Sequence, residues 1–278
     1  MKAALAGVIV DSTLQTELMR VAHLLADAAR KETLALFRTT GLEGDNKAAT
    51  SGGYDPVTAA DRASEAAMRA ILERERPQDG ILGEEFGTQA GDSGLTWVLD
   101  PIDGTRGFVS GIPTWGVLIS VADATGPIYG LIDQPYIGER FEGGFGRADL
   151  VGPTGAHPLT SRAHRSLEQA TLISTFPEVG SPDERAAFER VRDAVRLTRY
   201  GTDCYGYALL AAGQVDLVIE AGLLPYDIHA PICVVRAAGG IITDWQGGDP
   251  QHGGRVIAAS TPETHAAALA LLQDGLSG

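Results

Sequence analysis

Two aspartates in one short segment carry the strongest chemical signal in the sequence. The segment Trp97-Val-Leu-Asp-Pro-Ile-Asp-Gly-Thr105 places Asp100 and Asp103 after an apolar strand, around a turn stiffened by proline. Hard divalent cations take oxygen ligands, and Mg²⁺ is usually held by a few carboxylates, water and phosphate oxygens. Gly104 and Thr105 follow where a helical turn should begin, and its free backbone N–H groups can bind phosphate. The pattern indicates a cation and phosphate site, and an Asx-type turn with solvated carboxylates is the alternative.

Further acidic positions favour the cation interpretation. Glu84 follows the apolar pair Ile81-Leu82, at the end of a predicted strand. Asp227 follows Pro225-Tyr226 near the start of a predicted helix, where an aspartate also serves as a common N-cap. Asp55 and Asp61 enclose another acidic segment, in which Asp61 can cap a helix and serve a site at the same time.

Charge and cysteine content limit the partners and the compartment. The 278 residues include 36 Asp and Glu against 22 Lys and Arg, a net charge of -14. Binding to nucleic acid or to anionic membrane depends on clustered basic residues, so we expect neither as a partner. Two cysteines do not make a disulfide framework, and the apolar run 3–10 is too short for a membrane span and lacks a cleavage site. A cytoplasmic location is expected.

Hydrophobic periodicity predicts the elements that position these residues in the first half of the chain. It indicates a helix over 13–37 with Ser12 as N-cap, and a second helix capped by Asp61. The polar segment 41–54 between them is predicted to be a loop. Five short apolar runs then predict a meandering sheet with helices on one side: 81–82, 97–99, 117–121, 128–132 and 139–145.

After about residue 150 the pattern changes to strands alternating with helices. A strand over 171–174 precedes a helix that opens at Ser181-Pro182, where Glu184 completes a capping box. The remaining predicted elements are 197–200, 204–212, 215–219, 227–238, 241–243, 256–259 and a last helix opened by Thr261-Pro262. We therefore predict an α/β protein with an α+β N-terminal subdomain over 1–150 and an α/β C-terminal subdomain over 151–278.

Four motifs, taken together and in order, resemble those of the inositol monophosphatase superfamily. They are Asp55-Pro-Val-Thr-Ala-Ala-Asp61, Gly83-Glu-Glu85, Trp97-Val-Leu-Asp-Pro-Ile-Asp-Gly-Thr105 and Tyr226-Asp-Ile-His-Ala-Pro231, and the match runs from about residue 13 to 270. The resemblance implies a layered α/β/α/β/α sandwich with the site between its halves. It further implies a metal-dependent phosphatase that uses two to three Mg²⁺ ions on a small phosphorylated metabolite.

The family's functional residues carry over position by position. By resemblance, Glu84, Asp100 and the carbonyl of Ile102 hold one metal, and Asp100, Asp103 and Asp227 hold the second, so most ligands fall in the N-terminal subdomain. The implied catalytic residues are Asp55, Thr105 and Glu84, with Asp55 polarising the Thr105 hydroxyl that orients and deprotonates the attacking water. The implied substrate-binding residues are Gly104, Thr105, Gly201, Thr202, Asp203, Glu220 and Asp227.

Two softer stretches resemble the histidinol-phosphate phosphatase branch of the superfamily. They are Gly130-Leu-Ile-Asp-Gln-Pro-Tyr136 with its continuation to Phe141, and 200–213 taken with Tyr226. In inositol enzymes the position of Asp203 is commonly alanine and that of Tyr226 commonly tryptophan. The resemblance thus implies hydrolysis of L-histidinol phosphate in histidine biosynthesis. An inositol-1-monophosphatase or another small-metabolite phosphatase of the superfamily remains an alternative, as does a binding module without catalysis.

Two further expectations concern contacts outside the metal ligands. His229 lies close to Asp227, but Mg²⁺ prefers oxygen, so we expect His229 on a helix surface or at an interface. We also expect the chain to form a homodimer.

Overall fold

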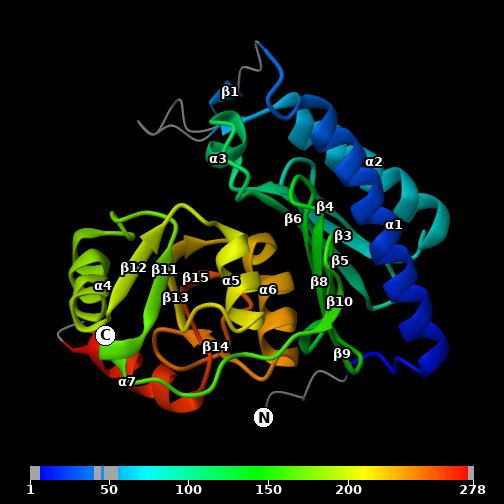
Figure 1. Ribbon diagram of the computed structural model, residues 1–278. Coiled ribbons are helices and arrows are strands. Elements are labelled where there is room, and N and C mark those ends of the chain that lie inside the picture. The colour runs from blue at the N-terminus through cyan, green and yellow to red at the C-terminus, as the bar shows by residue number, and fades with distance from the viewer. Residues whose placement is uncertain (1–6, 41–44, 47–55, 275–278) are drawn as a thin grey trace.

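The chain folds into five layers in which helices and sheets alternate. The computed structural model describes residues 7–40, 45–46 and 56–274 (Figure 1). It contains an eight-stranded sheet in the order β10-β9-β8-β7-β6-β5-β3-β4 and a five-stranded sheet in the order β12-β11-β13-β15-β14. The short strands β1 (Asp45–Asn46) and β2 (Pro56–Val57) pair separately.

Two long helices form the first layer, and both begin slightly earlier than expected. In α1 (Ser12–Leu36) the N-cap is Asp11, whose carboxylate accepts the Leu14 N–H at 2.9 Å. In α2 (Ala59–Glu75) the N-cap is Thr58, and Asp61 completes a capping box. The predictions of Ser12 and Asp61 as N-caps were therefore wrong, because the preceding side chains reach the free N–H groups first.

The large sheet is antiparallel except where β3 runs parallel to β5. Five of its strands coincide with the strand segments predicted in the first half, and β8 ends at Gly144, one residue before the predicted end. The boundary predicted at residue 150 falls inside β9, so the large sheet continues past it, and the division into two subdomains stays a prediction. The strands are β3 (Gly80–Gly83), β4 (Gly87–Gln89), β5 (Thr96–Asp103), β6 (Gly116–Asp123), β7 (Gly126–Gln134), β8 (Glu139–Gly144), β9 (Arg147–Gly152) and β10 (Gly155–Pro158).

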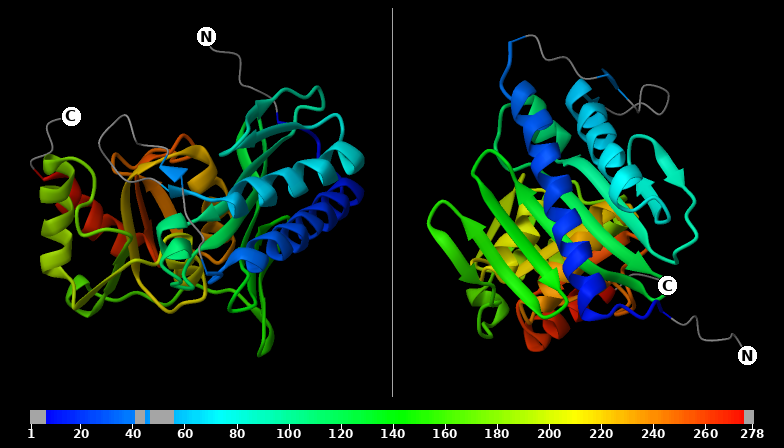
Figure 2. Two further views of the ribbon diagram at one scale, coloured as in Figure 1. Left: turned by 90° about the horizontal axis from the view of Figure 1, so that it is seen from above. Right: turned by 90° about the vertical axis from the view of Figure 1, so that its right-hand side faces the viewer.

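Helices cover both faces of this sheet, so the expectation of helices on one side was wrong. Helices α1 and α2 lie across one face, as the right-hand view of Figure 2 shows, and Leu25, Met68 and Trp97 are buried there. Helices α5 (Cys204–Ala211) and α6 (Pro225–Ala237) pack on the other face, where Leu118, Ile132 and Ile228 share one core. A sheet whose strands are apolar on both faces can be covered by helices on both faces. The spacing of the strands along the sequence did not show that this sheet is covered in this way.

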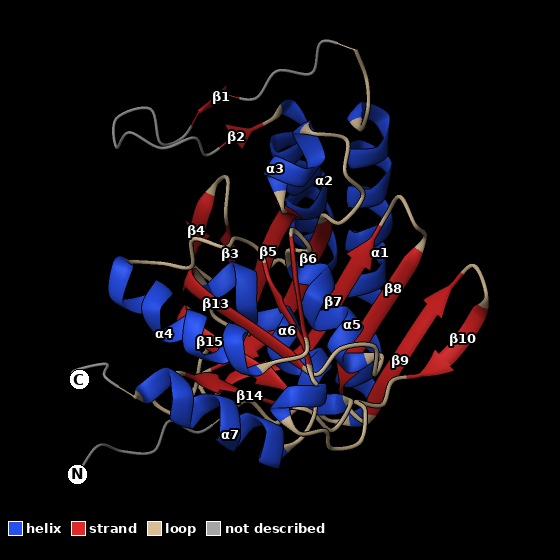
Figure 3. Ribbon diagram, turned by 60° about the vertical axis from the view of Figure 1, so that its left-hand side comes forward, coloured by secondary structure: helices blue, strands red, loops and turns tan. Residues whose placement is uncertain are grey.

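The five-stranded sheet closes the far side of α5 and α6, and two more helices cover its outer face (Figure 3). The capping box of Ser181 and Glu184 opens the first of these helices as predicted. The sheet consists of β11 (Thr171–Ser174), β12 (Leu197–Tyr200), β13 (Leu217–Leu223), β14 (Ile241–Asp244) and β15 (Gly254–Ala259); the covering helices are α4 (Pro182–Ala194) and α7 (Pro262–Gln273), with the 3₁₀ turn η1 (Leu167–Gln169). This arrangement confirms the expected α/β/α/β/α sandwich.

Within the part of the chain that the structure describes, no helix is long and apolar enough to cross a membrane.

Candidate active site

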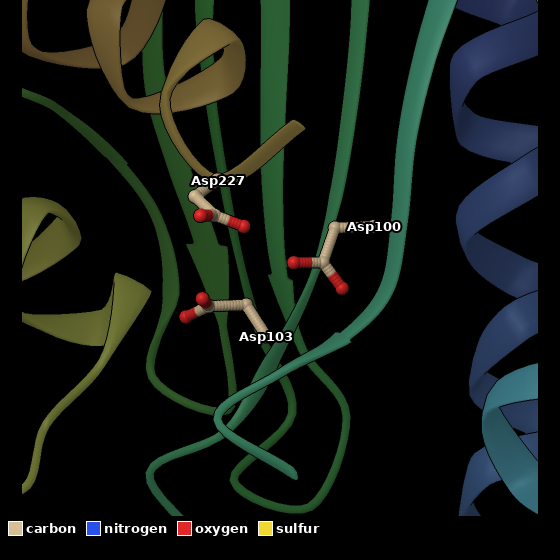
Figure 4. A group of neighbouring side chains, drawn as sticks. All are labelled: Asp100, Asp103 and Asp227. Atoms are coloured by element: carbon tan, nitrogen blue, oxygen red, sulfur yellow. The ribbon is translucent and has the colours of Figure 1, made fainter. Parts of the chain in front are cut away.

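Three aspartates from two distant parts of the chain converge between the layers. Asp100 and Asp103 come from the end of β5, and Asp227 comes from the first turn of α6. One carboxylate oxygen of each lies within 4.8 Å of those of the other two, and Figure 4 shows the three groups facing a common space. Three of the predicted metal ligands are therefore brought together.

Local backbone features hold these carboxylates in place. The pairing of β5 with β6 is irregular between Asp100 and Asp103, so both side chains turn toward the site. Asp100 accepts the Ile102 N–H at 3.0 Å, and Asp103 accepts the Cys204 N–H of α5 at 2.5 Å. Asp227 accepts the Leu224 N–H at 2.7 Å at the start of α6. Each aspartate thus has a fixed orientation set by backbone donors.

Burial and mutual repulsion oppose ionisation of this group. Burial raises the pKa of Asp100 well above its usual range, and the nearby charges of Glu84, Asp103 and Asp227 raise it further. Burial and the charge of Asp227 raise the pKa of Asp103 to about 8, against the Cys204 N–H, which lowers it. The pKa of Asp227 rises to about 7, again chiefly through burial. A cluster of this kind is stable in its ionised form only beside a positive charge.

The donor set fits a hard divalent cation such as Mg²⁺, because it consists of oxygen ligands that need positive charge. Glu84 lies directly after β3, lines the same cavity, and acts on Asp100 electrostatically. Ile102 also lines the cavity, and its carbonyl accepts a hydrogen bond from the Thr105 hydroxyl at 3.0 Å.

The Thr105 hydroxyl lies beside Asp61. Its Oγ1 is 3.4 Å from Asp61 Oδ1, while Asp61 Oδ2 accepts the Thr58 N–H and hydroxyl at 2.8 and 2.6 Å. Asp61 is fully buried, and burial is the main cause that raises its pKa. Asp55, the residue that the resemblance paired with Thr105, lies outside the described residues. In the described part of the chain, Asp61 is the carboxylate that holds this hydroxyl.

A cavity of about 330 Å³ connects the acidic cluster with the five-stranded sheet. Seven of its lining side chains are carboxylates, and Arg106 is the one basic lining residue in the described part of the chain. Of the predicted substrate-binding residues, Gly104, Thr105, Asp203, Glu220 and Asp227 line the cavity. Gly201 and Thr202 do not line it; the Gly201 carbonyl accepts the Thr114 hydroxyl, and the buried Thr202 hydroxyl has no partner.

Asp203 sits in a strained position against Gly104. Its backbone has φ +46, an uncommon conformation for a residue other than glycine. Gly104 has φ +89, and a Cβ built there would lie 2.8 Å from Asp203 Cγ, so only glycine fits. Burial and the charge of Asp103 raise the pKa of Asp203 to about 7, while Arg106 lowers it.

Glu220 is held by three donors. Its carboxylate accepts the Thr175 N–H at 3.1 Å, the Thr175 hydroxyl, and the Tyr207 hydroxyl at 3.2 Å. Burial raises its pKa to about 7 against the effect of these donors. Sequence reasoning missed both Thr175 and Tyr207, although the position of Thr175 directly after the strand 171–174 was an available signal.

His229 is not a surface residue. It is 8% exposed, and its Nε2 hydrogen-bonds to the Gln251 carbonyl at 2.8 Å, so the first alternative, a helix surface, was wrong, and the second, an interface, stays a prediction. The reason is that α6 lies between two sheets and is covered on most sides.

Comparisons with known proteins agree with this geometry. The family model described as the inositol monophosphatase family matches residues 14–277. The bifunctional phosphatase IMPL2, chloroplastic, of Arabidopsis thaliana is 46% identical over 194 residues, which cover 69% of this chain and 55% of that protein. The histidinol-phosphatase of Mycobacterium tuberculosis is 37% identical over 246 residues, which cover 87% of this chain and 93% of that protein.

A solved structure described as an inositol monophosphatase from Zymomonas mobilis has the same fold. It superposes with a TM-score of 0.81 at 38% identity, covering 95% of this chain and 99% of that chain. With the family match over nearly the whole chain, these findings show that the chain belongs to the inositol monophosphatase family and is a phosphatase.

Proposed function

We propose that this phosphatase hydrolyses L-histidinol phosphate to L-histidinol and phosphate, and that it depends on Mg²⁺. The observation that carries the proposal is the convergence of Asp100, Asp103 and Asp227 within 4.8 Å, in a cavity that Thr105 also lines. Phosphate monoesters hydrolyse very slowly without catalysis, and carboxylates alone would repel the substrate. The site therefore needs bound cations, and its oxygen donors suit Mg²⁺.

The protein's own residues supply ligands and a route for a proton. Two to three Mg²⁺ ions held by Glu84, Asp100, Asp103, Asp227 and the Ile102 carbonyl would neutralise the phosphate and lower the pKa of the attacking water. The Thr105 hydroxyl lies within hydrogen-bond distance of both the Ile102 carbonyl and Asp61 Oδ1, at 3.0 and 3.4 Å. When its proton turns from the carbonyl to Asp61, its oxygen is free to accept a hydrogen bond from that water. As the water oxygen bonds to phosphorus, its proton passes to Thr105 Oγ1 and the hydroxyl proton passes to Asp61. The bond from phosphorus to the ester oxygen breaks, and the leaving alkoxide takes a proton from solvent, to which Asp61 later returns its own.

In the cavity, two carboxylates outside the predicted metal ligands favour an alcohol that carries positive charge. Asp203 and Glu220 line it, and charge-assisted hydrogen bonds from an ammonium group to a carboxylate are among the stronger kinds. Histidinol carries an ammonium group, whereas inositol carries only hydroxyls. The relatives named histidinol-phosphatase support this choice, and the solved structure from Zymomonas mobilis supports inositol 1-phosphate as the alternative.

A substrate panel tests the proposal. Protein freed of metal with EDTA and supplied again with Mg²⁺ is assayed with L-histidinol phosphate and myo-inositol 1-phosphate. We expect no turnover without metal and a kcat/KM at least about tenfold higher for histidinol phosphate. An equal or higher kcat/KM for inositol phosphate would contradict histidinol phosphate as the preferred substrate. Full activity after EDTA treatment would contradict the dependence on Mg²⁺. The absence of turnover with either ester would favour a binding module.

The homodimer, the cytoplasmic location and the absence of nucleic-acid and membrane partners remain predictions from the sequence.

A further inference from the structure

An exposed aromatic side chain lines the cavity of the candidate active site. Phe176 is 41% exposed, although large apolar side chains are usually buried, and it lines the cavity. It lies two residues after β11, directly after Thr175, whose N–H and hydroxyl hold Glu220. Phe176 is thus the chain neighbour of a residue that holds a predicted substrate-binding carboxylate.

Arg106 covers one face of this ring. Its guanidinium carbon lies 4.7 Å from the centroid of Phe176, the geometry of a cation–π contact. Arg106 follows Thr105 in α3 (Thr105–Val109), whereas Phe176 extends from the five-stranded sheet. The contact therefore joins the two walls of the cavity and fixes the position of the ring.

We propose that Phe176, held by Arg106, forms the specificity subsite for a planar aromatic or heteroaromatic ring on the alcohol half of the substrate. This inference rests on the proposed function and names a feature of the substrate that the carboxylates do not recognise. Aromatic rings stack on phenylalanine in offset or edge-to-face arrangements, which an aliphatic group does not reproduce. In L-histidinol phosphate the ammonium group lies between the phosphate and the ring. The acidic cluster, the carboxylates Asp203 and Glu220, and Phe176 all line the same cavity.

A pair of esters separates ring recognition from the rest of the site. L-histidinol phosphate and L-alaninol phosphate share the phosphate and the amino alcohol, but only the first has a ring. Phe176→Leu retains an apolar side chain without a ring, and Phe176→Tyr retains the ring. We expect Phe176→Leu to raise KM for histidinol phosphate about tenfold with kcat within about twofold, and to leave alaninol phosphate unchanged. Phe176→Tyr should behave like the wild type with both esters.

The matched control is Phe86→Leu. Phe86 is 51% exposed and also contacts an arginine, with the Arg69 guanidinium carbon 5.9 Å from its ring, but it does not line the cavity. We expect no change in KM for either ester. Thermal unfolding of all variants shows whether each remains folded.

The possible outcomes separate the inference from the proposed function. Equal effects of Phe176→Leu on both esters, or no effect on histidinol phosphate, overturn ring recognition. A wild type that hydrolyses both esters with equal kcat/KM also overturns it but leaves the phosphatase proposal standing. If the wild type hydrolyses neither ester with Mg²⁺, the proposed function fails and the inference fails with it.

Discussion

The two groups of buried carboxylates in the cavity differ in what holds them. Asp100, Asp103 and Asp227 face one another, and neighbouring negative charges add to the effect of burial on their pKa values. Glu220 lies on the opposite wall, where Thr175 and Tyr207 donate hydrogen bonds that oppose the effect of burial. The first group therefore depends on cations to offset the repulsion between its charges, whereas hydrogen-bond donors partly offset the burial of Glu220.

This difference separates catalysis from recognition. Loss of a residue in the aspartate group should remove charge that holds metal and so reduce kcat. Loss of a carboxylate on the opposite wall should weaken binding of the alcohol and raise KM. The four predictions below test this separation, from the largest expected effect to the smallest.

Asp100→Asn should reduce kcat by at least about a thousandfold, because it removes a charge from the centre of the metal-binding group. Steady-state kinetics with histidinol phosphate at saturating Mg²⁺ measures the loss. The matched control is Glu220→Gln, which should mainly raise KM. If both variants lose kcat to the same degree, the two walls do not divide catalysis from recognition.

Thr105→Val and Asp61→Asn should each reduce kcat by about a hundredfold or more, because general base catalysis typically contributes that much. Valine keeps the volume of threonine, so Mg²⁺ affinity measured by calorimetry should stay within about threefold. If only KM rises, the Thr105 hydroxyl contributes to binding of the substrate in its ground state. Its contact with Asp61 would then have no role in proton transfer.

Asp203→Asn should raise KM for histidinol phosphate about tenfold and leave that for inositol 1-phosphate within about twofold. Asparagine has nearly the same shape as aspartate, so it meets the same backbone strain at φ +46 and ψ -140, and the effect reports charge. The ratio of kcat/KM values for the two esters is the measurement. An unchanged ratio would contradict a role of Asp203 in substrate recognition.

The metal-free protein should be less stable at pH 8 than at pH 5.5. The pKa values of Asp103, Asp227 and Glu220 are raised to about 8, 7 and 7 in the folded state, so the folded state binds more protons than the unfolded state in this range. Stability is therefore lost as pH rises through these values. Calorimetry should show a Tm lower by about 5 °C or more at pH 8, and Mg²⁺ should reduce the difference. A Tm that rises with pH would contradict the assignment.

The sequence by itself determined the local features of this protein. The spacing of Asp100 and Asp103, five of the eight strands of the large sheet and the capping box of Ser181 and Glu184 depend on a few neighbouring residues. The strands β4, β9 and β10 were not predicted. The four motifs, taken together and in order, were sufficient to identify the family and therefore the layered fold. The N-caps of α1 and α2 escaped prediction, because adjacent polar residues compete for the same free N–H groups.

Only the tertiary structure decided which side chains meet. Asp61 fits a local capping pattern, so its contact with Thr105 became visible only when α2 and the end of β5 were placed side by side. The anchoring of Glu220 by Thr175 and Tyr207 likewise depends on packing between α5 and the five-stranded sheet. The contact of Arg106 with Phe176 joins the two walls of the cavity. Helix and strand patterns extend over a few residues, whereas these contacts depend on the packing of layers that are distant in sequence.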